Sequence, residues 1–204
     1  MYIPEIYKNH NKQEIENFIH ENGFGILINQ TNGKLCASHI PLVLKNVENE
    51  TQILEAHLSI ENEQAQNFKN GDDVLVVFSG AHSYISSSWY DHENVPTWNY
   101  WAVHVYGKVS LLNYDETVFS LKTLVDKYET NSENPLKVEN ISKKTMLQAR
   151  GIIGFHIEIT SIEAVKKMSQ NRDKKNLKNI ISELEKINKP NEIAVANELK
   201  KCPF

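Results

Sequence analysis

The sequence predicts an α+β protein in which about six antiparallel strands form a small barrel with peripheral helices and a C-terminal helical appendage. The first observation is Asn32-Gly33 between two β-rich runs, because Asn-Gly favours the tight turn of a hairpin. The second is a third β-rich run, 51–59, that follows a short polar turn at 46–50, as in an antiparallel meander. The third is the change to apolar residues at helical spacing beyond Asp173.

The N-terminal half is expected to alternate between short helices and strands. Ile15, Phe18 and Ile19 share one face of a predicted helix over 11–22, and Gly23 ends it. Strands are expected over 24–30, 35–44, 51–59 and 73–80, with a brief helix over 61–68.

The C-terminal half is expected to contain two long strands and three helices. The stretch 97–112 alternates in polarity and is rich in β-branched and aromatic residues, which predicts a fifth strand. Asn113 is a suitable N-cap for a helix that runs to about Tyr128. A sixth strand is expected over 151–169, and the helix that follows Asp173 is interrupted by a proline before a final short helix.

Composition is that of an ordinary soluble protein, with 40% hydrophobic and 24% charged residues. No repeat, linker or change of composition divides the 204 residues, so we expect one domain over 1–204, with 172–204 as a helical extension. The start lacks a basic segment followed by an apolar run, and no stretch approaches the roughly 18 apolar residues of a membrane span. We therefore expect a cytoplasmic protein without a membrane partner.

Charge and cysteine content count against two further classes of protein. The formal net charge is −4, which is not the electrostatic signature of a nucleic-acid-binding protein. Cys36, in an expected strand, and Cys202, near the end, are too few for a disulfide scaffold. Two free thiols in a cytosolic chain are expected.

Aromatic residues are concentrated between positions 81 and 107, where all three tryptophans and four of the eight tyrosines lie. This stretch has no Lys or Arg, and its acids are Asp91 and Glu93. The rings are suited to a core, a subunit interface or a planar ligand. Serines, His82 and Asn99 lie between them, and a dry core would have to pair every one of these polar groups. The pattern favours a flat ligand with polar edges.

Motifs for metal binding or catalysis are not found in this sequence. The histidines form no His-x-His or His-Glu-x-x-His pair, and His39, His57 and His104 occupy expected strands, where structural histidines are common. No serine or cysteine lies in a nucleophile elbow, and Gly23-Phe24-Gly25 enters a strand rather than a helix. We therefore assign no catalytic residue and no metal ligand.

An anion site is suggested by the second of the two arginines, Arg150 and Arg172. Arg172 ends the polar sequence Ser-Gln-Asn-Arg at the junction of the last strand and the C-terminal helix, where helix dipoles also favour an anion. The alternative is a solvated arginine beside a helix cap. The basic run from Lys166 to Lys178 has a DNA-binding interpretation and, as the favoured alternative, that of a solvated face.

Six motifs follow one another along the chain: ASHIPLVL (37–44), EAHLS (55–59), FSGAHSYISSSWY (78–90), VPTWNYWAVHVYG (95–107), GIIGFHIEI (151–159) and KMSQNR (167–172). In this order they resemble the PaiB-type FMN-binding negative transcriptional regulators. The resemblance implies a split β-barrel of the pyridoxamine-phosphate-oxidase-like class and an intertwined homodimer with FMN at the subunit interface. It also implies repression of genes for sporulation and extracellular protease synthesis.

The resemblance further implies which residues contact FMN. Ser38, His39 and Ile40 are expected along the isoalloxazine edge, mainly through backbone groups, with His57 on the same barrel surface. The wall against the flavin and ribityl chain is expected to consist of Ser83, Tyr84, Ile85, Ser86, Trp89 and Tyr90, closed by Trp98, Asn99 and Tyr100. The polar tail is expected at Gln170, Asn171 and Arg172, with Arg172 on the phosphate.

Three functions follow as hypotheses. The leading one is an FMN-binding homodimer that represses transcription without turnover. The alternative is a flavin-dependent oxidoreductase in which the cofactor supplies the redox chemistry and His39, His57 or Tyr90 donates protons. The third is direct DNA binding through the Lys166–Lys178 run, against which the acidic net charge counts. The expected partners are FMN, a second copy of the chain, and DNA or a regulatory protein.

Overall fold

The computed structural model describes residues 1–47 and 51–201; residues 48–50 of the predicted polar turn, and Cys202, lie outside the described residues. The strands are β1 (Phe24–Thr31), β2 (Lys34–Pro41), β3 (Val43–Asn46), β4 (Gln52–Ser59), β5 (Asp73–Ile85), β6 (Thr97–Leu111) and β7 (Ile152–Lys167). The α-helices are α1 (Lys12–Glu21), α2 (Glu63–Gln66), α3 (Tyr114–Glu129), α4 (Lys143–Met146), α5 (Lys174–Ile187) and α6 (Pro190–Lys200). Short 3-10 helices lie at Glu5–Tyr7, Ser87–Trp89, Val138–Asn140 and Leu147–Gly151.

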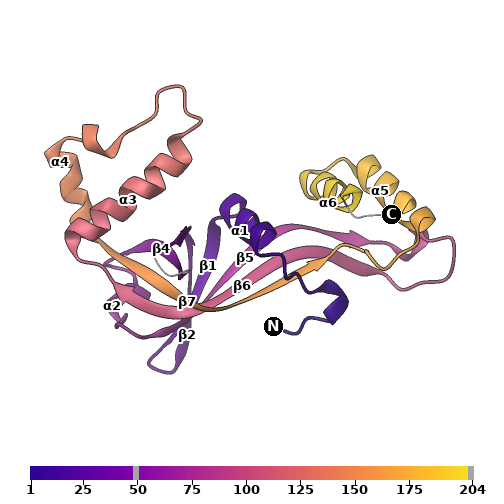
Figure 1. Cartoon of the computed structure of the whole chain (residues 1–204), viewed down its shortest axis with the longest axis horizontal. Helices are drawn as coiled ribbons and strands as arrows, with labels where there is room; N and C mark the ends of the chain where they lie inside the picture. Colours follow the sequence, from indigo (N-terminus) through magenta and orange to yellow (C-terminus); the bar gives the residue numbers. More distant parts are fainter. Residues whose placement is uncertain (48–50, 202–204) are drawn as a thin grey trace. The chain divides into compact units, whose positions relative to one another are not determined.

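The α+β class is confirmed, and within the described residues seven strands form one sheet in the order β2-β1-β5-β6-β7-β4-β3 (Figure 1). The pairings β1–β2, β1–β5, β3–β4 and β4–β7 are antiparallel. The β1–β2 hairpin turns at Asn32 and Gly33, whose φ angles of 51° and 80° explain why Asn-Gly stands there. The predicted hairpin is therefore confirmed.

The predicted count of six strands is wrong, because the run 35–44 makes two strands. β2 ends at Pro41, and after Leu42 the chain enters β3, which pairs with β4 at the opposite edge of the sheet. Leu42 donates its N–H to the carbonyl of Gly23 at 2.8 Å instead of continuing a strand ladder. The step from Pro41 to Val43 spans at most about 7 Å of chain, so the two edge strands come close at this corner. Among the described strands no β2–β3 pairing closes the sheet.

Capping residues determine where α3 and α5, the long helices after β6, begin and where α5 ends. Asn113 accepts from the Glu116 N–H while the Glu116 carboxylate accepts from the Asn113 N–H, which is a complete capping box for α3. Asp173 caps α5 by accepting from two backbone N–H groups at 3.0 Å. Asn188, at a φ of 53°, ends α5 in the left-handed conformation. The predicted helices here are confirmed.

The chain divides into two compact units, which we describe separately. The larger unit comprises residues 16–78 and 104–162. Its core includes Leu27, Phe78 and Phe155, none of which is exposed, and the ring of Phe68 meets that of Phe155 edge-on at 5.2 Å. α3 lies directly against β7, because a Cβ on Gly154 would be 2.5 Å from the Thr117 hydroxyl.

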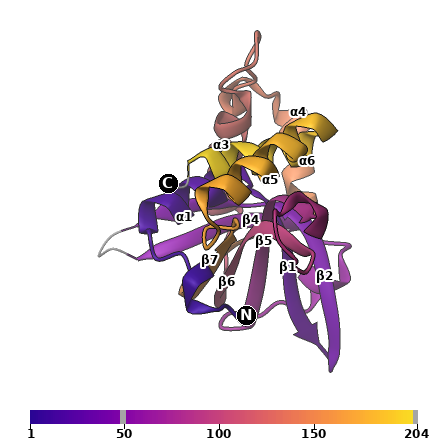
Figure 2. The same ribbon diagram turned by 90° about the vertical axis from the view of Figure 1, so that its right-hand side faces the viewer.

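The smaller unit comprises residues 1–15, 79–103 and the described chain from 163 onward. α5 and α6 pack against each other (Figure 1; Figure 2). Their buried face consists of Leu177, Ile180, Ile181, Leu184, Val195, Ala196 and Leu199. The ends of β5, β6 and β7 contribute Ile85, Val103 and Val165 to the buried set of this unit. In the described residues, no helix has the length and apolar character needed to cross a membrane.

Candidate functional site

The β6 segment 97–103 has one buried and one exposed face. Asn99 is completely buried and Trp101 is 9% exposed, whereas Trp98, which precedes Asn99, is 53% exposed. Successive side chains of a strand point to opposite faces, so this alternation follows from strand geometry. The sequence-predicted residues of β6 therefore divide: Asn99 faces the core and Trp98 faces outward, with Tyr100, half-buried, at the same alternate position as Trp98.

Three rings gather on the outward face. Tyr84, at the end of β5, is 46% exposed, and its ring lies 6.0 Å from that of Trp98 in an edge-to-face arrangement. The ring of His82 lies 6.2 Å from Trp98. The neighbours Ser83 and Ile85 are buried. A cluster of half-exposed aromatic rings is a surface suited to covering a flat apolar molecule.

Tyr90, another aromatic residue of this unit, contacts Arg172, which the sequence predicts to bind an anion. The Arg172 guanidinium lies 5.1 Å from the centre of the Tyr90 ring. This contact is a cation–π interaction, and a guanidinium carries several N–H donors that can bind an anion. Tyr90 is 8% exposed, and its hydroxyl is buried without a hydrogen-bond partner among the described residues. A buried hydroxyl without a partner suits a ligand whose polar group forms the missing hydrogen bond.

Gln170 and Asn171, the two residues before Arg172, differ in the surroundings of their side chains. Gln170 accepts from the Met168 N–H at 2.7 Å and donates to the carbonyls of Ile6 and Lys166 at 3.2 and 2.7 Å. Its amide therefore holds the turn before α5, and any role of this side chain in a ligand site is one of positioning. Asn171 is exposed.

The loop between β5 and β6 is anchored to the start of α5 by Asn176, which is 2% exposed. Its amide oxygen accepts from the Asp91 N–H at 3.0 Å, and its NH2 donates to the carboxylates of Asp91 and Asp173 at 2.8 and 2.7 Å. Lys175 pairs with Asp91 at 2.8 Å. Hydrogen bonds from Lys175, His92 and Asn176 hold the pKa of Asp91 well below its ordinary value. The loop that bears Trp89 and Tyr90 is thus fixed at its C-terminal side.

The same loop begins in a serine cap. Ser86 caps the 3-10 helix Ser87–Trp89 by accepting from the Ser88 N–H at 3.2 Å, and its hydroxyl lies 2.8 Å from that of Ser88. Trp89 is half-buried. Ser86, which the resemblance predicts to contact the flavin, therefore also has a structural role as the cap of this 3-10 helix.

Asn99 contributes a buried polar group beneath the rings. Its amide oxygen accepts from the Ser169 hydroxyl at 3.1 Å, and Ser169 takes a positive φ of 51° at the turn before α5. The Asn99 NH2 is buried and has no partner within the described chain. A donor left unpaired in a buried site costs free energy unless a water or ligand accepts from it.

The other sequence-predicted residues lie in the larger unit. Ser38 accepts from the Asn62 NH2 at 2.9 Å, and Ile40 is 6% exposed, so Ile40 offers only its backbone. His39 is exposed, with its ring stacked 6.3 Å from Phe24. His57 is half-buried, and burial lowers its pKa, which favours the neutral ring. These four residues therefore belong to the larger unit, whereas the ring cluster belongs to the smaller one.

The larger unit also has a buried ion cluster that the sequence did not reveal. Glu55, 5% exposed, lies 2.6 Å from the Lys45 ammonium and 3.0 Å from the His156 ring. Burial alone would raise the pKa of Glu55, but hydrogen bonds from His156 and Lys45 outweigh it and lower the pKa. Asn176 was missed for a related reason, because its partner Asp91 is 85 residues away in sequence. Where the structure describes the chain, no three His, Cys, Asp or Glu side chains are grouped to hold a metal.

Comparison with known proteins identifies relatives over nearly the whole chain. Residues 1–161 match the family model described as "Putative FMN-binding domain". The "Protease synthase and sporulation protein PAI 2" of Bacillus subtilis is 43% identical over 192 residues, covering 94% of this chain and 92% of that protein.

Solved structures show the same fold at low sequence identity. The FAD and haem binding protein of Mycobacterium smegmatis superposes with a TM-score of 0.61 at 12% identity, over 79% of this chain and 73% of that one. A flavocytochrome of Azotobacter vinelandii gives a TM-score of 0.61 at 11% identity, over 81% and 72% of the two chains. These likenesses concern the fold alone. By its sequence, the chain belongs to the family described as "Putative FMN-binding domain" and is a homologue of PAI 2.

Proposed function

We propose that this protein binds FMN as a homodimer of the PAI 2 type and acts as a negative regulator of genes for protease synthesis and sporulation. The regulatory part of the proposal is supported by 43% identity to PAI 2 over 94% of the chain, since the name of that protein refers to protease synthesis and sporulation. Action on transcription would require a cytoplasmic location, which the proposal includes.

The observation that favours FMN most is the exposed ring cluster of Tyr84, His82 and Trp98 in the smaller unit. Tyr84 and Trp98 would lie against the isoalloxazine, and Arg172, which contacts the Tyr90 ring, would pair with the phosphate through its N–H donors. The unpaired Tyr90 hydroxyl and Asn99 NH2 fit a ligand with polar groups. Bound FMN would supply redox chemistry, and these residues would bind and orient it.

The remaining predicted contacts stay within the proposal. Ser38, His39 and Ile40 lie on β2, an edge strand whose outer side has backbone groups available for a ligand or a second chain. Trp89, Tyr100 and Asn171 are proposed contacts of the same flavin, as are Ser83, Ile85, Ser86 and His57, and Gln170 is proposed to position the turn that bears Asn171 and Arg172.

A homodimer and a split barrel complete the proposed architecture. Leu35 on β2 and Phe24 on β1, in the larger unit, are 74% and 64% exposed. Large apolar side chains left in solvent on an edge hairpin are typical of a subunit interface. The near approach of the sheet edges at Leu42 is compatible with a split barrel.

Direct DNA binding through the Lys166–Lys178 run is less favoured, because several of its charges have partners. Lys166 pairs with Glu14 and Glu198, and Lys175 pairs with Asp91. We therefore favour regulation through a protein partner. A gel shift whose affinity falls steeply with salt would instead indicate phosphate contacts.

Two experiments test the proposal. The absorption spectrum of the purified protein should show flavin bands, and a protein of the expected purity that neither retains nor takes up flavin would contradict it. Deleting the gene should raise transcripts and secreted activity of extracellular proteases, and complementation should restore them. Sustained NAD(P)H-driven bleaching and reoxidation of the flavin would favour the oxidoreductase alternative.

A further inference from the structure

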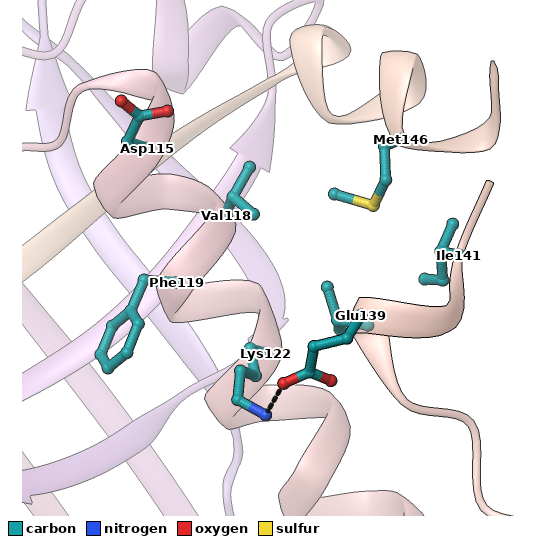
Figure 3. Close-up of a pocket in the computed structure, with 8 residues that line it drawn as sticks. Asp115, Val118, Phe119, Lys122, Glu139, Ile141 and Met146 are labelled. Atoms are coloured by element: carbon teal, nitrogen blue, oxygen red, sulfur yellow. Dashed lines mark ion pairs between the residues drawn. The ribbon is translucent and has the colours of Figure 1, made fainter. Parts of the chain in front are cut away.

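A cavity of about 450 Å³ opens in the larger unit between α3 and the segment 138–146 (Figure 3). Its volume lies within the range of about 300–1,000 Å³ that is common for small-molecule sites. Val118 on α3 points toward Met146 on the opposite wall, and Phe119, Ile141 and the buried Val138 complete the apolar part. The body of a bound molecule would therefore contact aliphatic side chains and a flexible thioether.

The polar part of the cavity has an excess of negative charge. Asp115, Lys122 and Glu139 line it, and an ion pair joins Lys122 to Glu139 (Figure 3). The same ammonium lies 3.3 Å from the carboxylate of Asp126, one turn farther along α3. Its hydrogen bond lowers the pKa of Glu139, so this carboxylate is ionised at neutral pH. Lys122 pairs with Glu139 and Asp126, and Asp115 is a second carboxylate of the lining, so two carboxylates and one ammonium give the lining an excess of one negative charge.

We propose that this cavity binds a hydrophobic amine, with its aliphatic or aromatic body against Val118, Ile141 and Met146 and its ammonium against Glu139. Lys122 does not block this arrangement, because Asp126 can hold it when the ligand takes Glu139. A ligand with a carboxylate would be repelled by the excess negative charge, and a neutral ligand would leave that charge uncompensated. None of the lining residues is an expected FMN contact, so the inference is independent of the proposed function.

The test uses three probes with one body and different heads: 4-phenylbutylamine, 4-phenylbutanol and 4-phenylbutyrate. Methyl-13C-methionine labelling reports on the cavity directly, because the chain has three methionines and Met146 lines the wall. Met168, 1% exposed in the smaller unit, is the internal reference. The amine should shift the Met146 methyl resonance saturably and leave Met168 unchanged. It should bind about fivefold more tightly than the alcohol, the value of one partly exposed ion pair, and more tightly still than the acid.

Charge variants of matched chemistry complete the test. Glu139→Gln should weaken the amine about fivefold with little change for the alcohol. Glu133→Gln removes the same charge from an exposed position in the same connecting segment outside the cavity, and should leave all three affinities unchanged. Asp115→Asn, on the first turn of α3, is the second variant if Glu139→Gln disturbs the fold. An unmoved Met146 resonance, equal binding of acid and amine, or an equal effect of Glu133→Gln would overturn the inference.

Discussion

Replacing Trp98 by alanine should weaken FMN binding without unfolding the protein. The side chain is 53% exposed, so its removal leaves no core cavity. A tryptophan buries about 200 Å² when fully covered, so the exposed half offers about 100 Å², worth up to about 2.5 kcal/mol at about 25 cal/mol per Å². Stacking on one face of the ring would bury less area, and about 1 kcal/mol is the lower bound of its contribution to the binding free energy. The dissociation constant should rise about 5- to 60-fold.

The assay is quenching of flavin fluorescence on titration of FMN with apoprotein, in parallel for the unmodified protein and Trp98→Ala. Phe119→Ala is the matched control, because it removes a ring that is 64% exposed on α3 in the larger unit. Thermal unfolding of all three proteins checks that they fold. A Trp98→Ala protein that binds FMN within twofold of the unmodified chain, or a Phe119→Ala protein that loses as much affinity, would refute the role of this ring.

Three other substitutions test separate features. Arg172→Ala should weaken FMN about 10- to 100-fold, the value of charge-assisted hydrogen bonds, yet leave riboflavin affinity unchanged, and equal losses for both flavins in titrations would count against a phosphate contact. Glu55→Gln should cost about 3–5 kcal/mol in urea unfolding at pH 7 and flatten the pH dependence. Because the pKa of Glu55 is lowered in the folded protein, its ionised form stabilises the fold above about pH 5, and this stabilisation is lost on acidification. If the unfolding free energy of Glu55→Gln falls with acidification as steeply as that of the parent, this role of Glu55 is contradicted. Gly154→Ala should lose about 1–3 kcal/mol through its clash with α3, whereas Gly151→Ala, with open space around it, should unfold like the parent.

The sequence predicted the elements whose signals are local. Asn32-Gly33 specified the hairpin, and Asn113 and Asp173 marked helix starts, because each acts on backbone groups within four residues. β3 was missed, because the division of the apolar run at Leu42 depends on pairing with β4 across the sheet. Continuous apolar sequence does not show which edge a strand will join.

The site was predictable as a region and not as a set of contacts. The ring-rich stretch was evident from composition, but the burial of Asn99 and the exposure of Trp98 are features of the folded sheet, in which Asn99 pairs with Ser169 in the turn between β7 and α5. Gln170 was expected as a ligand donor, and its backbone partners at Ile6 and Lys166 could not be inferred from spacing. Asn176 had no sequence signal beyond its place in a helix start.

Titration of the apoprotein with FMN tests the central claim most directly. The account predicts saturable quenching of flavin fluorescence with one FMN bound per chain, and weaker binding of riboflavin, which lacks the phosphate. Flavin fluorescence that stays unchanged as apoprotein is added in excess would contradict it.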